Sequence, residues 1–447
     1  MKRVFTIILG ILLIAAVGVF IVAKSVNTVP DENLPLEDQA IVILSDGGCF
    51  ACHSQHPQKS WYHSLPYLAE RFENEAEDAA RWFDMDNAYA MLHSTEGMSL
   101  PDILRLKNLA EDRSMPPISY SIMHWKSPIT PEKAEVLLKW LKDYHRRFYP
   151  NGNAPQFADE PISVIPDVSP LPVDSAKVRL GEMLYNDTRL SADNTISCAS
   201  CHDLNEKYGT DNEQVSDGVN AAEGTINSPT VLNSVFNFVQ FWDGRAKTLA
   251  EQAAAPPVNP VEMANESFDQ IIAKLVEDKA FMEEFGKVYS EVTEATITDA
   301  IEHFERTLLT PNGAFDRYLK GDASAIDADA VEGYALFKSR DCADCHSGVI
   351  VGGRTYEYMG LTNDYFAARG PIVKPAIDDR GHYSVTDDPY DLHRFKVPGL
   401  RNVAYTWPYF HDGTRETLEE AVKDMAWYQH GIVLPDVEVA KIVAFLK

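Results

Sequence analysis

CASCH, at residues 198–202, is the stretch on which the fold of this chain depends. In a CxxCH motif the two thiols bond covalently to the vinyl groups of haem, and the adjacent histidine ligates the iron. The motif recurs as CFACH at 49–53 and CADCH at 342–346, and the three copies hold all six cysteines of the 447-residue chain. Disulfides or structural zinc would not place every pair two residues apart before a histidine. We therefore predict three covalently bound haem c groups, held by Cys49, Cys52 and His53, by Cys198, Cys201 and His202, and by Cys342, Cys345 and His346.

The central motif differs from the other two in its downstream residues. No histidine occurs between His202 and His303, whereas each flanking motif has a methionine downstream. A haem closed by His and Met passes electrons, while one with a weak or empty sixth position can bind a small oxidant. We expect two electron-transfer haems that supply one reactive iron at His202.

The chain begins with a basic pair and an apolar run. Lys2 and Arg3 precede Val4–Ala23, and 20 residues at helical rise span about 30 Å, the thickness of a bilayer core. The run predicts a transmembrane anchor over 1–24 and a polar tether over 25–38, with everything after Lys24 exported. The expected location is the bacterial inner membrane, with a single N-terminal span and the catalytic part in the periplasm. A cleaved signal peptide is the alternative.

Beyond the tether, one plan repeats three times. An amphipathic helix leads to CxxCH, a loop-rich segment comes next, and a second helix closes the unit. The predicted helix pairs are Leu36–Ser45 with Pro131–Phe148, Val178–Tyr185 with Ile297–Leu309, and Val331–Lys338 with Val437–Leu446. The expected domains are 39–149, 175–312 and 313–447, with a proline-rich linker at 150–174. The fold class expected is mainly α: three cytochrome c-like haem domains in tandem behind an N-terminal transmembrane helix.

The sixth ligand of the N-terminal haem has several candidates. Met115 precedes Pro116 and Pro117 on a stiff loop shortly before the closing helix, as expected of an axial methionine. Met98 is the alternative methionine. A bis-histidine haem would instead use one of His63, His93, His124 or His145.

The formal net charge of −27 limits the classes of molecule that the chain could bind. It argues against nucleic acid and against an anionic membrane surface. It would suit a basic soluble redox protein, although a solvated acidic surface explains the charge as well.

Residues of about 175–447 resemble the bacterial dihaem cytochrome c peroxidases. The matching blocks are GTDN (209–212), NSPTVLN (227–233), FWDGRAKTL (241–249), FERTLLTPN (304–312), FDRYLKG (315–321), VPGLRNVAYTWPYFHDG (397–413) and IVAFLK (442–447). With an anchor and a third haem domain in front, the architecture is most similar to the tri-haem quinol peroxidases.

The resemblance implies roles for single residues. His202 would carry the peroxidatic haem, with Gln252 and Glu262 on its distal side and Trp242 on the electron route between two haems. Cys342, Cys345 and His346 would hold a high-potential haem closed by Met425. A calcium ion would be bound by Asn227, Thr406 and Pro408, a hard-oxygen set.

The chemistry of peroxide reduction can also be argued without the family, and Glu262, which the family pattern singles out, is the candidate for it. Cleavage of the O–O bond needs a group that takes a proton from one oxygen and returns it to the other. A carboxylate can do this if burial moves its pKa towards the working pH. Gln252 can orient peroxide by hydrogen bonding without titrating.

The expected function is reduction of hydrogen peroxide to water, with electrons from membrane quinol passing through the N-terminal and C-terminal haems. A soluble cytochrome c or cupredoxin is the alternative donor. Two other interpretations are an electron-transfer relay in which Met263 closes the central haem, and a maturation oxidase with an axial Tyr, against which Met425 argues. The oligomeric state is open, with a homodimer one expectation.

One expectation concerns the resting enzyme. Relatives often rest with a distal histidine on the peroxidatic iron, but no residue from 203 to 302 is histidine, and Asp217 lies near the corresponding position. A buried carboxylate is a poorer match to haem iron than imidazole. We expect an oxidised peroxidatic haem that is five-coordinate or holds only water, and needs no reductive activation.

Overall fold

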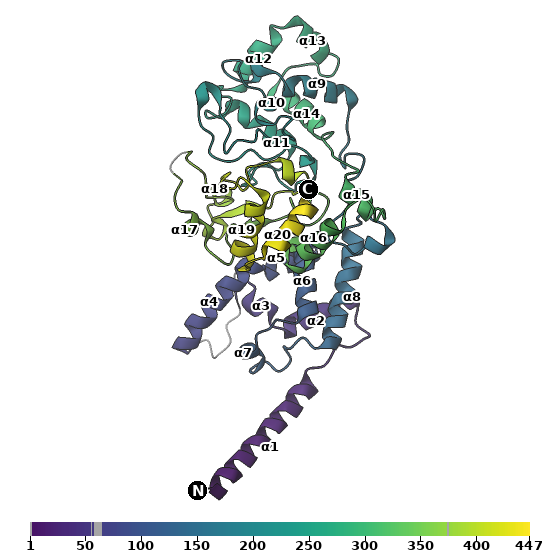
Figure 1. The fold of residues 1–447 in the computed structure, drawn as a ribbon, viewed down its shortest axis with the longest axis vertical. Coiled ribbons are helices and arrows are strands. Elements are labelled where there is room, and N and C mark those ends of the chain that lie inside the picture. The colour runs from purple at the N-terminus through teal and green to yellow at the C-terminus, as the bar shows by residue number, and fades with distance from the viewer. Residues whose placement is uncertain (1, 55, 58–64, 373–374) are drawn as a thin grey trace. The chain divides into compact units, whose positions relative to one another are not determined.

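The computed structural model describes residues 2–54, 56–57, 65–372 and 375–447. Helices dominate these residues, and the described strands are limited to one short antiparallel pair (Figure 1). The chain separates into two compact units, Met1–Pro150 and Asn151–Lys447. His63 lies outside the described residues.

Three tandem haem domains behind a transmembrane helix were expected, and this fold class is wrong in two respects. The second and third CxxCH segments lie in one compact unit, so there are two units rather than three. Crossing a bilayer core takes about 20 consecutive apolar residues in one helix. No helix in the described part of the chain is both long and apolar enough. The anchor over 1–24 and the single-span inner-membrane location are therefore corrected.

The first unit is helical throughout. Its helices are α1 (Lys2–Val26), α2 (Leu36–Asp46), α3 (Cys49–Cys52), α4 (Pro66–Trp82), α5 (Met85–Leu92), α6 (Leu100–Asp112), α7 (Ile118–Ser121) and α8 (Pro131–Phe148). The predicted helix at Pro131–Phe148 is confirmed. Thr130 begins it, because the Thr130 side chain accepts a hydrogen bond from the backbone N–H of Lys133, and Pro131 fits the first turn. The apolar face of α8 packs with α2 and α6 in one core.

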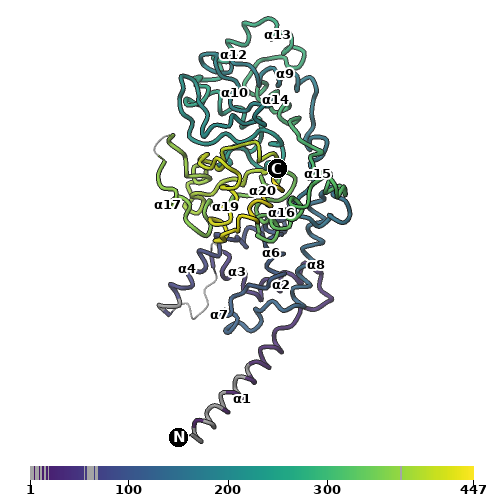
Figure 2. Tube along the Cα trace, viewed as in Figure 1, coloured from purple at the N-terminus to yellow at the C-terminus, as the bar shows by residue number. Residues whose placement is uncertain are grey.

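The second unit holds the remaining helices and the two strands. Figure 2 traces its backbone to the yellow C-terminal end. The α-helices are α9 (Ser175–Tyr185), α10 (Cys198–Cys201), α11 (Leu249–Ala254), α12 (Phe268–Val276), α13 (Lys279–Phe285), α14 (Glu294–Glu305), α15 (Ala314–Leu319), α16 (Ala328–Ser339), α17 (Tyr365–Arg369), α18 (Tyr383–Thr386), α19 (Leu418–His430) and α20 (Asp436–Leu446). The 3-10 turns are η2 (Pro155–Phe157), η3 (Thr188–Leu190), η4 (Val219–Ala221), η5 (Ser234–Phe236), η6 (Pro256–Val258), η7 (Cys342–Asp344), η8 (Pro389–Asp391) and η9 (Val403–Tyr405). Strands β1 (Tyr356–Tyr358) and β2 (Arg394–Lys396) pair with Tyr356 opposite Lys396.

Two helix pairs organise this unit, α9 with α14 and α16 with α20. Each pair crosses at a glycine. A Cβ on Gly181 of α9 would overlap the Ala300 carbonyl of α14, and a Cβ on Gly333 of α16 would overlap the Lys441 carbonyl of α20. The absence of a side chain therefore lets both pairs approach backbone to backbone.

Helix α14 begins earlier than the sequence predicts. The predicted helix starts at Ile297, whereas the N-cap of α14 is Thr293, whose hydroxyl accepts a hydrogen bond from the backbone N–H of Thr296. The Thr296 hydroxyl accepts from the backbone N–H of Thr293 in return. This reciprocal pair satisfies two end groups of the helix, so Thr296 lies inside it.

The proline-rich segment at 150–174 contributes to the core of the second unit. Ile162 and Val164 are buried there with residues of α16 and α20. The Asn153 amide donates to the carbonyls of Phe157 and Ile162, and folds the segment back on itself.

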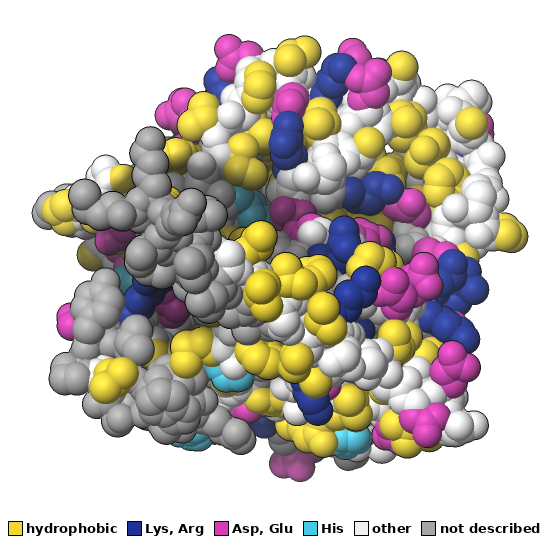
Figure 3. Space-filling model, turned by 90° about the horizontal axis from the view of Figure 1, so that it is seen from below, with side chains coloured by type: hydrophobic (Ala, Val, Ile, Leu, Met, Phe, Trp, Pro, Cys, Tyr) yellow, Lys and Arg dark blue, Asp and Glu magenta, His cyan; other side chains and the backbone are white. Residues whose placement is uncertain are grey.

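Charged side chains of both signs share the surface. On the face in Figure 3, Asp and Glu are interspersed with Lys and Arg and do not form one acidic patch.

Candidate active site

The three CxxCH motifs share one local geometry. Each motif begins a single helical turn, and the backbone N–H of its histidine donates to the carbonyl of its first cysteine. The N···O distances are 2.8 Å for His53 to Cys49, 3.0 Å for His202 to Cys198, and 3.0 Å for His346 to Cys342. No disulfide joins any of the six cysteines, all of which lie in the described part of the chain, and burial raises the pKa of the first thiol of each motif to about 12.

The three imidazoles are prepared to bind iron. Nδ1 lies 2.9 Å from the Ala79 carbonyl in His53, 3.1 Å from the Gly209 carbonyl in His202, and 3.3 Å from the Val351 carbonyl in His346. A carbonyl only accepts, so Nδ1 carries the proton and Nε2 keeps a free lone pair. Burial lowers the pKa of each histidine, to about 4 for His346, and so favours the neutral form that ligates metal. The residues therefore fit covalently bound haem with Nε2 as the iron ligand.

Glu262 lies in the neighbourhood of the central motif. Its charge raises the pKa of both thiols, Cys198 and Cys201. Its Oε1 accepts a hydrogen bond of 2.6 Å from the Asn259 amide. Burial raises the pKa of Glu262, and Arg245 and Asn259 oppose the rise only in part.

The loop after the central motif supports Glu262 through the backbone. The Val219 N–H donates to the Glu262 carbonyl at 2.8 Å, and Gly218 packs so closely that a Cβ there would overlap the Val261 carbonyl. Asp217 is exposed, although its charge raises the pKa of Cys201. Gln252 lies partly buried on α11, which packs against α14. Met263 is buried in the apolar core around α12 and α14.

Glu305 is a buried acid near the same motif that the sequence analysis did not single out. It lies at the end of α14, is 4% exposed, and its Oε2 has no hydrogen-bond partner among the described residues. Burial, reinforced by Glu302, raises its pKa to about 8. Its charge raises the pKa of the Cys198 thiol and of the Tyr185 hydroxyl. The Tyr185 hydroxyl donates a hydrogen bond to the His202 carbonyl at 2.6 Å. Glu305 lies within the block FERTLLTPN, which the sequence analysis quoted for the family resemblance. Only the fold shows that its side chain is buried.

Trp242 belongs to an aromatic cluster that connects loops of the second unit. Its Nε1 donates to the Asn227 carbonyl at 2.9 Å. Its ring meets His411 edge-on at 6.3 Å and Phe395 at 6.4 Å, and those two rings stack at 4.1 Å. The Lys396 N–H donates to the Trp242 carbonyl at 2.7 Å. The cluster therefore joins the FWDGR loop to β2, the strand that leads into the His346 site.

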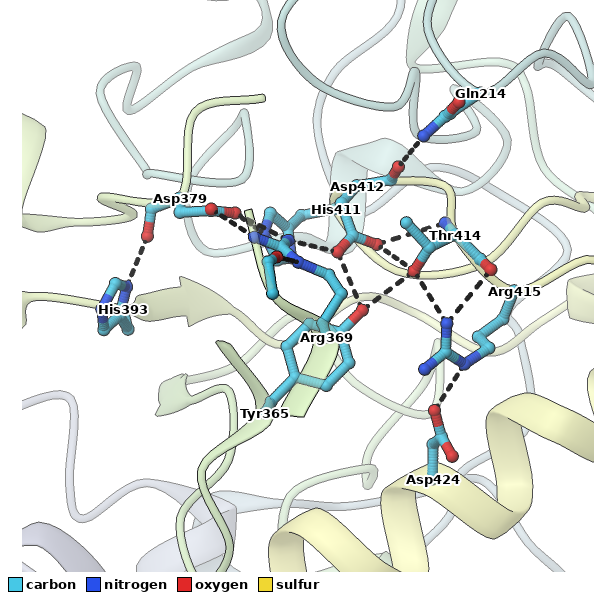
Figure 4. A network of polar contacts seen from close by, with 11 residues as sticks. Gln214, Tyr365, Arg369, Asp379, His393, His411, Asp412, Thr414, Arg415 and Asp424 are labelled. Atoms are coloured by element: carbon cyan, nitrogen blue, oxygen red, sulfur yellow. Dashed lines mark hydrogen bonds and ion pairs between the residues drawn. The ribbon is translucent and has the colours of Figure 1, made fainter. Parts of the chain in front are cut away.

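A network of ion pairs joins the loop at 411–415 to Arg369, to Asp379 and to α19, the helix that carries Met425 (Figure 4). Arg369 bridges Asp379 and Asp412, each at 2.6 Å, and Asp379 also contacts His411 at 2.9 Å. Arg415 pairs with Asp424 at 2.5 Å. Asp424 directly precedes Met425 in the middle of α19, so the network ties the part of the helix that carries this methionine to the loop of Arg415.

The three residues expected to bind calcium lie on loops that the fold joins. The Asn227 amide nitrogen donates to the Glu213 and Gln214 carbonyls, which leaves its Oδ1 to accept. Asn212 donates to the carbonyls of Tyr405 and Trp407, on either side of Thr406. Pro408 follows Trp407 through a cis peptide bond.

In the first unit the two candidate methionines differ in burial. Met98 is 2% exposed and packs in the core, whereas Met115 is 41% exposed. Tyr120, five residues after Met115, packs on Gly48, where a Cβ would overlap the hydroxyl. The loop that carries Met115 thus lies against the residue before Cys49.

The histidine alternatives in this unit lie in different settings. Nδ1 of His124 contacts the Tyr120 carbonyl, and its ring stacks on Tyr120. His93 packs edge-on against Tyr89, and His145 is buried.

Comparison with known proteins identifies the family. A family model described as di-haem cytochrome c peroxidase matches residues 175–324, and one described as a haem-binding domain matches residues 11–143. The cytochrome c peroxidase of Escherichia coli is 43% identical over 411 residues, which cover 92% of this chain and 87% of that protein. The cytochrome c551 peroxidase of Nitrosomonas europaea is 47% identical over 294 residues, covering 65% and 84%. The chain belongs to the di-haem cytochrome c peroxidase family and is an oxidoreductase that binds haem.

A solved structure agrees with this assignment. The crystal structure of a MauG-like protein associated with microbial copper homeostasis aligns with a TM-score of 0.55 at 29% identity. The alignment covers 64% of this chain and 93% of that one.

Proposed function

We propose that the chain, a cytochrome c peroxidase, reduces hydrogen peroxide at the His202 site and that Glu262 transfers the proton there. The observation that carries the proposal is the position of Glu262: a partly buried carboxyl with a raised pKa, whose charge raises the pKa of both thiols of the central motif. The bound haem would supply the electrons and the iron at which peroxide is reduced.

The roles of the side chains follow from their chemistry. Reduction of one peroxide consumes two electrons and two protons and yields two waters. Glu262 would accept a proton from one peroxide oxygen and return it to the other, so that this oxygen leaves as water. The hydrogen bond from Asn259 holds Oε1, which leaves Oε2 to move the proton. The Gln252 amide would orient peroxide by hydrogen bonding.

Haem at all three CxxCH motifs is part of the proposal. The motifs share the same turn and the same Nδ1 contact to a carbonyl, which supports equal capacity to bind haem. Met425 would close the His346 haem and Met115 the His53 haem. Trp242 would lie on the electron route to His202, since its cluster reaches β2.

A structural calcium ion is also proposed at Asn227, Thr406 and Pro408. The free Oδ1 of Asn227 and the backbone carbonyls of the other two offer the oxygen ligands that calcium prefers. The ion would tie the loop of Asn227 to the loop after η9.

The electron donor is proposed to reduce the first unit. A membrane quinol was expected partly because the sequence predicted an N-terminal anchor. The described helices include none that could span a membrane, so the anchor no longer supports a quinol. A quinol and a soluble cytochrome c are therefore equal candidates. Steady-state peroxide turnover with each reduced donor, on wild type and on Met115→His, separates them. Peroxide turnover supported by the true donor should be slower in the variant than in wild type. Turnover supported by an artificial donor that reduces the second unit should be unchanged.

Glu262→Gln tests the proton-transfer role. The amide keeps size and burial but cannot exchange a proton, so peroxide turnover should fall about 100-fold or more. Haem content, from the visible spectrum of the pyridine complex, should be unchanged. The matched control is Glu266→Gln, an exposed glutamate four residues on, which should turn over like wild type. Near-normal turnover by Glu262→Gln with full haem content would remove Glu262 from the mechanism.

A further inference from the structure

Burial lowers the pKa of three lysines, and one of them differs from the other two. The Lys133 ammonium donates to the Lys126 carbonyl at 2.7 Å, and the Lys274 ammonium to the Ser191 carbonyl at 2.5 Å and the Asn265 side chain at 3.2 Å. Lys396 is 5% exposed, and no hydrogen bond or ion pair joins its ammonium to any described residue. Burying an unpaired charge is costly, so the site lacks a counter-charge.

The position of Lys396 relates it to two functional segments. Its N–H donates to the Trp242 carbonyl, and two residues later the Pro398 carbonyl contacts the His346 imidazole. Its cross-strand partner is Tyr356, so the two side chains share a face of the strand pair. The Tyr356 hydroxyl fills the space beside Gly244 in the FWDGR loop.

The carboxylates around this face are already engaged. Asp391 pairs with Arg394 at 2.8 Å, and Asp243 with Arg245 at 2.9 Å. Asp379 is held by Arg369 and His411. None of these acids forms an ion pair with Lys396 in the described structure, so the counter-charge has to come from a bound group.

We propose that Lys396 binds a propionate carboxylate of the haem attached to Cys342 and Cys345. This rests on the proposed haem at that motif. Haem carries two propionates, and β2 leads directly to the carbonyl that contacts His346. A lysine with no protein partner offers three donors and a full positive charge to such a carboxylate.

The pairing has an electrostatic consequence. An ammonium against the propionate offsets negative charge that would otherwise favour the oxidised iron, so it raises the reduction potential of this haem. Lys396 is thus a positioning residue that helps to make the His346 haem the better electron acceptor of the second unit.

Redox titration of the haem-loaded protein, followed by visible spectroscopy, tests the proposal. Lys396→Met should shift the potential of the His346 haem negatively and leave that of the His202 haem in place. Lys396→Arg should keep the wild-type value, since it restores the charge. Lys274→Met, which removes a buried lysine with protein partners, is the matched control and should shift neither haem.

Three results would overturn the pairing. They are unchanged potentials in Lys396→Met, a shift confined to the His202 haem, and equal shifts in the methionine and arginine variants. If Lys396→Met fails to fold, a crystal structure of haem-loaded wild type decides, because the Lys396 nitrogen must lie within about 4 Å of a propionate oxygen. The mass of the peptide with Cys342 and Cys345 checks the proposed function separately, since a peptide without haem would refute attachment rather than the pairing.

Discussion

The two halves of the second unit share a scaffold and differ in buried charge. In both, two helices cross at a glycine, Gly181 in one and Gly333 in the other, and a CxxCH turn presents a histidine whose Nδ1 contacts a carbonyl. The His202 half contains the partly buried Glu262 and the buried Glu305, both with raised pKa values, while the buried cation Lys396 lies in the strand leading to His346. If haem binds both motifs as proposed, the shared scaffold would position the two haems and the surrounding charges would separate a proton-handling site from an electron-accepting one.

Ligand binding should separate the halves most strongly. Cyanide added to the oxidised protein should bind the His202 haem alone, because no histidine from 203 to 302 can close it and Met263 is buried in the core. Electron paramagnetic resonance should show a high-spin ferric signal that cyanide converts to low spin. Three low-spin haems before cyanide, with binding only after partial reduction, would mean that another group occupies the site.

Alanine at the crossing glycines should test the shared scaffold. In Gly181→Ala the new Cβ meets the Ala300 carbonyl, and in Gly333→Ala it meets the Lys441 carbonyl. Backbone atoms cannot move aside cheaply, so each variant should lose about 3 kcal/mol of unfolding free energy. Denaturant unfolding followed by circular dichroism measures this. A loss in only one variant would show that the two crossings are not equivalent.

Glu305 should make stability depend on pH. Its folded pKa, about 8, lies above the ordinary 4.5, so the folded state binds the proton more tightly. The stabilisation is fully present below pH 4.5 and is lost as pH rises to about 8. Between those limits wild type should lose on the order of 4 kcal/mol more than Glu305→Gln, which has no proton to release, because each pKa unit corresponds to about 1.4 kcal/mol. Unfolding at both pH values gives the difference, and parallel pH profiles would contradict the assignment.

The smallest effect is expected at the surface of the His346 half. Lys423 on α19 pairs with Asp436 at 2.7 Å, but both side chains are at least half exposed. Lys423→Ala should change the unfolding free energy only slightly, because water and salt screen an exposed pair, and added salt should reduce the difference further. A larger loss would show that the contact between α19 and α20 depends on this pair.

Local patterns sufficed for the haem-binding turns and most helices. The CxxCH spacing determines a single turn with a histidine after it, and Thr130 with Pro131 places the start of α8. Such features depend on neighbours within four residues, which the sequence displays directly. Even there, α14 begins after an N-cap at Thr293, so the helix starts before the predicted first residue, Ile297.

The sequence by itself pointed to the family, which the comparisons confirm, and predicted the haem attachment sites and the candidate acid Glu262. Only the tertiary structure decided which charges lack partners, because burial depends on segments far apart in the chain. Glu305 and Lys396 look like ordinary surface residues in the sequence, yet the packing of α14 and of β2 removes both from water. The apolar run at the N-terminus predicted a membrane span that the structure does not support, and the second and third motifs share one unit. The spacing of residues along the chain determines local features such as the CxxCH turn. The burial of a side chain and the charges around it depend on which distant segments the fold packs against it.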